Sequence, residues 1–532
     1  MAFTAKSIPF ETTRSFSKLV NDYLTGNEKI SPFYEFTPDE QGMENAINAR
    51  KQFPVDRALL HKNVRKQYET VIINDRLQKN IDSLQSNNCF TICTAHQPNI
   101  FTGHLYFIYK ILHAVKLAEE LSAKYADHDF VPVYYMGSED ADIQELGELD
   151  ISGKHYQWAT NQKGAVGRMK VDEALIKIIE EVALQIEVLP FGHEIIAKMR
   201  TCYALGRSIE KATFAFVHSL LGNYGVVIIL PDSDDFKRAF LPIVEKELSE
   251  QFSSKAVAST IKDFPGEYKI QTEGREVNLF FLEANQRERV QLLDGKFSID
   301  GVDGDLTKSE LMEKFAEHPA RISPNVVLRP LFQEIILPNI VFIGGGGELA
   351  YWLELKTAFA AANVFFPVLM LRNSFMLMTK ETELLQARLQ VEDEALFLPV
   401  NVIFNEWIRK NADKQLLLES EKQKISEQFK QIKKIATEQD ATLNKHVEAL
   451  ETTALNKLSI LEKKILRAAR SREAATLRQI EKMKTAVFPN GSLQERVDNI
   501  VFWHAVYGND IIDTINKNST GNISSFQIIK AD

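Results

Sequence analysis

The feature that most restricts the fold of this 532-residue chain is a recurring order: a short apolar run, then a polar or glycine-rich loop. The runs are FTICTA (90–95), VPVYYM (131–136), GVVIIL (225–230), NIVFI (339–343) and FPVLML (366–371). Their length and β-branched content predict buried strands, and the helical stretches between several of them predict parallel crossovers. We therefore expect an α/β fold with a doubly wound parallel-sheet core.

The loops after these runs should lie together. In doubly wound sheets, ligands bind in a crevice outside the carboxyl ends of the strands. Two segments of different character, 151–222 and 263–325, interrupt the pattern. The first resembles a hairpin followed by helices, and the second contains alternating strands such as REVNLFFLEANQ. We interpret both as insertions that wall the crevice of a core formed by residues 1–378.

The C-terminal part has a different pattern. From about Thr379 the chain becomes charged and helical, with apolar positions at heptad-like spacing. The spacing predicts a helical coiled-coil domain over 379–488, with helices at roughly 415–438 and 442–487, and a segment 489–532 that returns to the core. The long second helix favours a homodimer, with packing on its own core as the alternative. The seam positions are Leu418, Ile425, Ile432, Leu443, Val447, Leu450, Leu458, Leu461 and Ile465.

Composition narrows the class of protein. A net charge of -9 and a pI near 5.8 argue against nucleic acid as a partner. No stretch of about eighteen apolar residues could span a membrane, and the N-terminus lacks the apolar core of a signal peptide, so we expect a cytoplasmic protein. Cys89, Cys93 and Cys202 are too few for a disulfide framework and match no zinc spacing, so no metal is predicted.

The stretch CTAHQPNIFTGHLYFIYK (93–110) joins the first strand to a helix. Thr102 and Gly103 near the helix start could bind an anion, and His96, Gln97 and Lys110 could add donors. The alternative is that Thr102 only caps the helix while the histidines are surface groups. The segment FTGH (101–104) is not the HxGH signature of nucleotidyltransferases, because position 101 is Phe rather than His.

The loop GSEDADIQE follows the second strand and places Glu139, Asp140 and Asp142 within four positions. Carboxylates at this edge could hold an ammonium group, hydroxyls or Mg²⁺, or act as a base. The alternative is helix capping by solvated acids.

FIGGGGELAYW places Gly344, Gly345, Gly346 and Gly347 between a strand and a helix, where backbone can approach a ligand. Position 349 is Leu instead of the third glycine of GxGxxG, so NAD and FAD are disfavoured, and no GxxxxGK[ST] loop occurs.

Upstream of the glycines, SPNVVLRPLFQE offers Arg329, Gln333 and Glu334. Arginine binds carboxylates through two parallel hydrogen bonds, so a small anion is a fitting ligand. The alternative is a surface salt bridge between Arg329 and Glu334.

Taken together, four stretches resemble the BshC family, the cysteine ligases of bacillithiol biosynthesis. They are TAHQPNIFTGHLYFIYKI, PVYYMGSEDADIQE, NVVLRPLFQEIILPNIVFIGGGGELAYWLELK and FPNGSLQERVDNIVFWHAVYG, in the family's order along nearly the whole chain. The resemblance implies a Rossmann-like core with connecting-peptide insertions, a dimerising coiled coil, and a reaction that joins L-cysteine to the amino group of glucosaminyl-malate. Gly345 departs from the proline expected in many members.

The motifs and the resemblance together assign the candidate site. Glu139, Asp140 and Asp142 are the catalytic candidates, and Asn490, Gly491 and Arg496 are nucleotide-binding candidates. The activation of the cysteine carboxylate stays open, with ATP or ADP as the candidate nucleotide. Two alternatives are a nucleotidyl- or glycosyltransferase acting on another sugar and a non-catalytic coiled-coil scaffold. The substrate-binding candidates are His96, Gln97, Thr102, Gly103, Tyr106, Lys110, Ser138, Arg329, Gln333, Glu334, Gly344, Gly345, Gly346, Gly347, Glu348, Tyr351 and Trp352.

Overall fold

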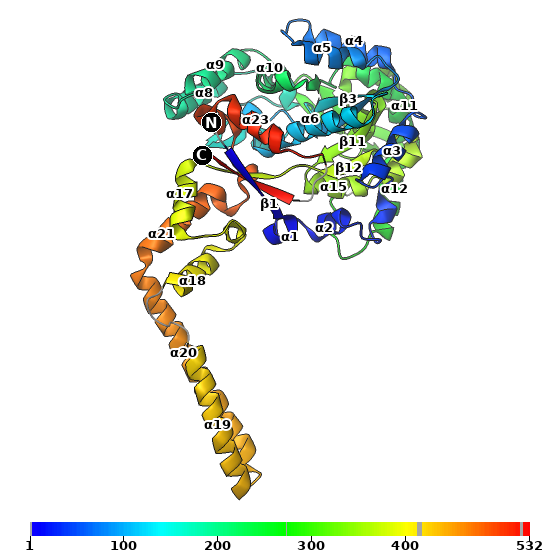
Figure 1. The fold of residues 1–532 in the computed structure, drawn as a ribbon. Coiled ribbons are helices and arrows are strands. Elements are labelled where there is room, and N and C mark those ends of the chain that lie inside the picture. The colour runs from blue at the N-terminus through cyan, green and yellow to red at the C-terminus, as the bar shows by residue number, and fades with distance from the viewer. Residues whose placement is uncertain (1–2, 273, 412–417, 522–524, 532) are drawn as a thin grey trace. The chain divides into compact units, whose positions relative to one another are not determined.

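The computed structural model describes residues 3–272, 274–411, 418–521 and 525–531 (Figure 1). The chain divides into two compact units. The first comprises Met1–Met376 and Ser492–Ile529, and the second comprises Leu377–Gly491 and Lys530–Asp532. No helix among the described residues is long and apolar enough to cross a membrane.

A five-stranded parallel sheet forms the centre of the first unit, in the order β12-β11-β2-β3-β6. All five strands coincide with apolar runs that the sequence predicted, and the predicted α/β class with a Rossmann-like parallel sheet is confirmed. The strands are β2 (Cys89–His96), β3 (Asp129–Met136), β6 (Val227–Ile229), β11 (Asn339–Gly344) and β12 (Val368–Leu371).

Helices α3 (Glu40–Arg50) and α6 (Tyr106–Lys124) contribute apolar side chains to one buried cluster with the sheet. Ala46 and Leu117 pack there with Ile92 and Val341, and each is at most 5 % exposed. Burying one such aliphatic side chain contributes about 1.5–3 kcal/mol, which explains why these apolar runs form interior strands. Figure 1 shows α6 lying along the sheet.

The N-terminal region before β2 is mainly helical. Its first strand, β1 (Phe3–Pro9), was not predicted, because it pairs in a sheet of order β1-β14-β13 with strands distant in sequence. Those strands are β13 (Phe375–Met378) and β14 (Ser525–Ala531). The helices are α1 (Phe10–Thr13), α2 (Lys18–Leu24), α4 (Arg57–Tyr68) and α5 (Asp75–Ser83).

The first inserted segment begins with a hairpin of β4 (Glu148–Ile151) and β5 (Lys154–Gln157). Short α7 (Ile143–Leu146) precedes the hairpin. Three helices follow it: α8 (Glu173–Ile186), α9 (Gly192–Cys202) and α10 (Ile209–Leu221).

The second inserted segment forms an antiparallel sheet of order β10-β7-β8-β9. Its strands are β7 (Leu279–Glu283), β8 (Gln286–Leu293), β9 (Lys296–Ile299) and β10 (Ile322–Pro324). Helices around it are α11 (Asp234–Glu250), α12 (Phe252–Asp263) and α13 (Lys308–Glu317). The first unit also contains α14 (Arg329–Ile336), α15 (Gly346–Leu353), α16 (Lys356–Ala362), α22 (Ile500–Tyr507) and α23 (Asn509–Asn518).

The second unit consists mainly of helices. Within it, α19 and α20 form an antiparallel hairpin, joined by Lys422–Glu462 and Lys433–Glu448 ion pairs of 2.5 Å each. The predicted single helix over 442–487 is wrong, because Glu473, with φ -95° and ψ 27°, separates α20 from α21. The helices are α17 (Lys380–Leu389), α18 (Val400–Asn411), α19 (Glu419–Gln439), α20 (Leu443–Arg472) and α21 (Ala474–Val487).

Candidate active site

A pocket of about 580 Å³ lies in the first unit, at the carboxyl ends of four strands of the parallel sheet. His96 ends β2, Gly137 follows β3, Gly345 follows β11 and Arg372 follows β12. This is the position where doubly wound sheets bind ligands. The volume is in the range of small-molecule sites.

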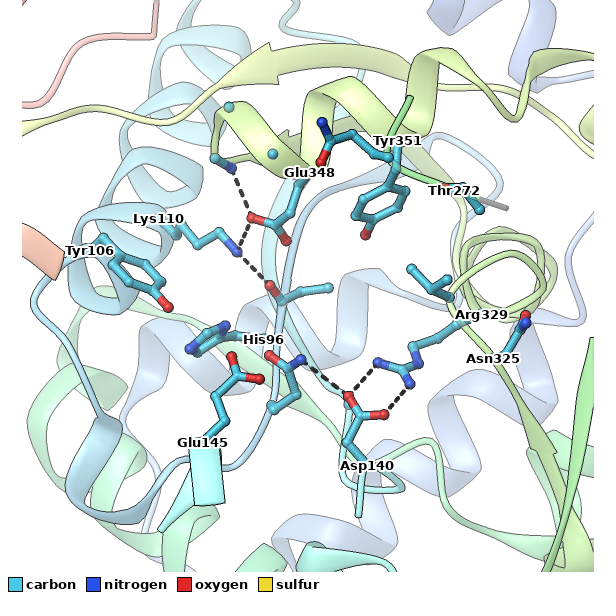
Figure 2. Close-up of a pocket in the computed structure, with 18 of the residues that line it drawn as sticks. His96, Tyr106, Lys110, Asp140, Glu145, Thr272, Asn325, Arg329, Glu348 and Tyr351 are labelled. Carbon is cyan, nitrogen blue, oxygen red and sulfur yellow. Dashed lines mark hydrogen bonds and ion pairs between the residues drawn. The ribbon is translucent and has the colours of Figure 1, made fainter. Parts of the chain in front are cut away.

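Asp140 and Arg329 form an ion pair at one side of the pocket (Figure 2). The two guanidinium nitrogens of Arg329 lie 2.9 and 2.6 Å from the two carboxylate oxygens of Asp140, and Gln97 donates to the same carboxylate at 3.1 Å. Burial alone would raise the pKa of Asp140, but Arg329 and Arg287 lower it to about 2. Asp140 is therefore a permanently ionised group that orients Arg329.

The glycine loop is fixed to α6 through Glu348. Its carboxylate accepts the backbone N–H of Gly345 at 2.8 Å and lies 2.5 Å from the ammonium of Lys110. Lys110 is 1 % exposed and also donates to the carbonyl of Ala95 at 2.8 Å. Burial lowers the pKa of Lys110, while Glu348 opposes this effect. The loop is thereby held beside the end of β2.

Gly344 and Gly347 have different environments. A Cβ atom at Gly344 would lie 2.9 Å from atoms of Glu348 and Phe342, so this position requires glycine. A Cβ at Gly347 would have no atom within 4 Å, and Gly347 lines the pocket. Packing therefore does not require glycine at position 347. The missing side chain there leaves the backbone open to a ligand in the pocket.

Arg372 is held by a buried carboxylate. Its two terminal nitrogens lie 2.9 and 2.6 Å from the oxygens of Glu495, and both side chains are at most 3 % exposed. The guanidinium lies 5.1 Å from the centre of the Tyr106 ring. This contact joins the returning C-terminal segment to the pocket, and the neighbouring Arg496 lines it.

His96 and Glu145 lie at the same end of the pocket as Tyr106 (Figure 2). Burial and the charge of Lys110 hold the pKa of His96 well below its usual value, so its imidazole is neutral. Its Nε2 atom is buried without a hydrogen-bond partner among the described residues. Glu145 is exposed, yet partial desolvation and the nearby Asp142 raise the pKa of its carboxyl group. This end offers a neutral imidazole and a carboxylate with raised basicity.

The second insertion forms the opposite wall. Arg287 on β8 stacks its guanidinium 3.9 Å from the centre of the Phe280 ring. Gln271, Thr272 and Arg275, from the loop before β7, complete this wall. The first insertion contributes no lining residue among those described.

Twelve of the residues singled out in the sequence line this one pocket. They are His96, Gln97, Tyr106, Lys110, Asp140, Arg329, Gly345, Gly346, Gly347, Glu348, Tyr351 and Arg496.

Two acids of the GSEDADIQE loop, Glu139 and Asp142, lie outside the pocket lining. Glu139 is 4 % exposed and pairs with Lys237 at 2.5 Å, in a buried cluster that also contains Asp232. Asp142 caps α7 by accepting the N–H groups of Gln144 and Glu145. Ser138 is fully buried and outside the pocket lining. A helix cap was the alternative that the sequence left open for these acids.

Thr102 and Gly103 form a structural turn outside the pocket lining. Phe101, Thr102 and Gly103 have φ of 49°, 73° and 62°. The amide of Asn499 donates to the carbonyls of Phe101 and Gly103 at 2.9 and 2.5 Å. The N–H of Leu105 donates to the carbonyl of Asp498 at 2.8 Å. The start of α6 is thus occupied by protein groups instead of being open to an anion.

Six further residues are outside the pocket lining, and one of them is Gly344, whose packing is described above. Gln333 donates to Glu334 at 2.9 Å, and both are buried on α14. Trp352 stacks on Phe342 with ring centres 4.3 Å apart. Asn490 and Gly491, both with positive φ, form the turn after α21 in the second unit.

Some lining residues were missed by sequence reasoning, chiefly Glu145, Arg275, Arg287 and Arg372. Glu145 stands within the acidic loop that was singled out, and Arg372 directly follows a predicted strand, so their positions carried a usable signal. Arg275 and Arg287 carried none, because an insertion's orientation toward the sheet is a tertiary property. Among described residues, no group of three His, Cys, Asp or Glu could hold a metal ion.

Comparison with known proteins adds independent information. The model of the N-terminal Rossmann-like domain of bacillithiol biosynthesis BshC matches residues 3–373, and that of its C-terminal coiled-coil domain matches residues 375–531. The chain belongs to the BshC family. The resemblance noted in the sequence is thereby confirmed.

Curated relatives agree with the family models. Proteins named putative cysteine ligase BshC match from Flavobacterium johnsoniae at 35% identity, with 95% of this chain and 96% of the relative covered, and from Christiangramia forsetii at 34%, with 98% of each covered. The relative from Cytophaga hutchinsonii is 35% identical, with 94% of each chain covered. This chain therefore spans nearly the whole length of these relatives.

Proposed function

We propose that this protein joins the carboxyl group of L-cysteine to the amino group of glucosaminyl-malate and so forms bacillithiol. The observation that carries the proposal is the charge pattern of the pocket. Arg329 and Asp140 lie at one side, with Arg287 3.7 Å from Asp140, whereas His96 and Glu145 lie at the other side, beside Tyr106 and the Glu495-paired Arg372. The names of the BshC relatives support the reaction class.

The proposed substrate matches this pattern. Glucosaminyl-malate carries two carboxylates, which suit guanidinium groups, and an amine and hydroxyls, which suit carboxylate and imidazole groups. One cavity of about 580 Å³ holds both sets of groups, which favours an elongated ligand with carboxylates at one end and an amine and hydroxyls at the other.

Glu145 is the base that this geometry favours. An amine attacks a carboxyl carbon only when it is neutral, so a group must accept its proton. Asp140 has a pKa of about 2 and is bound by Arg329, which makes it a weak base. Glu145 has a raised pKa and lines the same pocket, and the neutral His96 offers a second acceptor.

Amide formation from a free carboxylate is uphill in water, so the reaction requires an activated cysteine carboxyl group. We propose ATP as the source of activation. The proposal predicts that bacillithiol formation depends on ATP and releases either ADP with phosphate or AMP with pyrophosphate. Chromatography of the nucleotides identifies which pair is formed.

Thiol profiling of a deletion strain tests the function in the cell. Loss of bacillithiol with accumulation of glucosaminyl-malate is expected, and complementation with the intact gene should restore the thiol. Unchanged bacillithiol would contradict the proposal. Accumulation of a different sugar would instead favour a transferase acting on another substrate.

A further inference from the structure

Arg287 is a buried cation of the pocket whose hydrogen bonds are incomplete. Its side chain is 9 % exposed, and its Nε donates to the Ser323 hydroxyl at 3.1 Å. One terminal nitrogen, Nη2, is buried without a hydrogen-bond partner among the described residues, and it lies 3.7 Å from the nearer oxygen of Asp140. A buried donor without an acceptor lowers the stability of the fold, unless a ligand accepts its hydrogen bond.

The carboxylate nearest to Arg287 is already committed. The Asp140 carboxylate accepts hydrogen bonds from both terminal nitrogens of Arg329, at 2.9 and 2.6 Å, and from the amide of Gln97. Two guanidinium groups, those of Arg287 and Arg329, therefore share one close carboxylate. Arg275 lines the same wall and adds a further positive charge. The charge balance of this wall leaves room for an anion.

We propose that Arg287, assisted by Arg275, forms the subsite that binds the malate carboxylates of the substrate. This inference rests on the proposed function and names the end of the pocket where the malate lies. Arg329 lies next to this subsite, and its charge is neutralised by the ion pair with Asp140. The planar guanidinium group binds a carboxylate through two parallel hydrogen bonds. It binds a phosphate in the same way, so a nucleotide phosphate is the competing ligand.

The placement also sets the direction of the substrate. Arg287 comes from the second insertion, whereas Glu145 and His96 lie at the side of Tyr106. Malate at the insertion wall would direct the glucosamine amine toward Glu145. The insertion is thus the element that determines specificity for the dicarboxylate.

Arg289 provides a matched control. It lies two positions farther along β8, on the same face of the strand, but is exposed and outside the lining of this pocket. Arg287→Gln and Arg289→Gln remove the same charge from the same strand. Only the first should affect a ligand of the pocket.

The experiment measures binding of L-malate and of inorganic phosphate to the full chain by calorimetry, with KM for glucosaminyl-malate as the second readout. Arg287→Gln should weaken malate binding and raise KM about tenfold to a hundredfold, and Arg289→Gln should leave both within twofold. Thermal unfolding checks that each variant is folded. If Arg287→Gln fails to fold, Arg287→Lys replaces it, because it keeps the charge and loses the fork, and about tenfold weaker malate binding is expected.

Unchanged malate affinity and KM in the folded Arg287 variant would overturn the assignment, and bacillithiol formation would still support the function. Loss of phosphate binding alone would overturn it in favour of a nucleotide phosphate. Malate binding that depends on Arg287, in a protein that forms no bacillithiol, would support the subsite and contradict the function.

Discussion

Arg329 and Asp140 meet through two parallel hydrogen bonds, 2.9 and 2.6 Å long, although they are 189 positions apart in the sequence. The pair joins the start of α14 to the loop after β3. The sequence suggested this arginine as an anion ligand and this acid as a base, but in the structure the two side chains bind each other. Both residues therefore act by shaping the pocket.

Asp140→Asn tests this pairing. The change should destabilise the fold by about 2–3 kcal/mol, below the range for fully buried pairs because each side chain is one-fifth exposed. It should also lower kcat/KM about a hundredfold, since Arg329 loses its orientation. Denaturant unfolding of Asp140→Asn, Arg329→Gln and the double variant gives the coupling energy. A coupling energy below about 0.5 kcal/mol would show that the ion pair does not stabilise the fold.

Glu145→Gln tests the proposed base. A base works when ionised, so activity should fall as pH decreases through the pKa of Glu145, which partial desolvation and Asp142 raise. The variant should lose about a hundredfold in kcat and lose this acidic limb of the pH profile. A pH–rate profile measured on both proteins checks the prediction, and an unchanged limb in the variant would point to His96.

The sequence predicted the parts of the molecule that depend on local pattern. The five strands of the parallel sheet follow from apolar runs of strand length, and the loops after four of these strands line one pocket. The insertion wall could not be predicted, because Arg287 reaches the pocket through tertiary packing. Similarly, the N–H group of Leu105 near the start of α6 is occupied by Asp498, which is almost four hundred positions away.

Gly347→Ala tests whether the glycine loop admits a ligand. The added Cβ meets no atom within 4 Å, and alanine should stabilise α15 by up to about 1 kcal/mol. Substrate affinity should nevertheless fall, because the methyl group projects where backbone is open to the pocket. Gly266→Ala is the control, as its Cβ also meets nothing and it lies outside the lining. Equal affinities in the two variants would refute close approach at Gly347.

Glu334→Gln should change how stability depends on pH. Burial raises the pKa of Glu334 from 4.5 to about 7, so the folded state holds a proton that the unfolded state releases between these values. This group's contribution to stability is therefore greatest below pH 4.5 and falls as pH rises to 7, by roughly 3 kcal/mol. Unfolding free energies at pH 5 and 7 should differ less in the variant than in the native protein. An equal change in the unfolding free energy at pH 5 and at pH 7 would contradict this pH dependence.

The coiled-coil hairpin should form a homodimer. Val447 is buried within the hairpin, but Ile435, Leu450 and Leu461 are 63 %, 48 % and 47 % exposed. Exposed apolar side chains along one helical arm favour a second protein surface. Light scattering should give twice the 60.5 kDa chain mass, and Leu450→Glu with Leu461→Glu should reduce it to one chain. A native mass of one chain would show that the arm needs no partner.

The most direct test of the proposed function is mass spectrometry of the purified protein incubated with glucosaminyl-malate, L-cysteine and ATP. We predict bacillithiol with the cysteine in amide linkage to the glucosamine nitrogen, and about a hundredfold less product from Glu145→Gln. Reactions without ATP are expected to give none. Absence of the amide product from folded protein supplied with all three compounds would contradict the account.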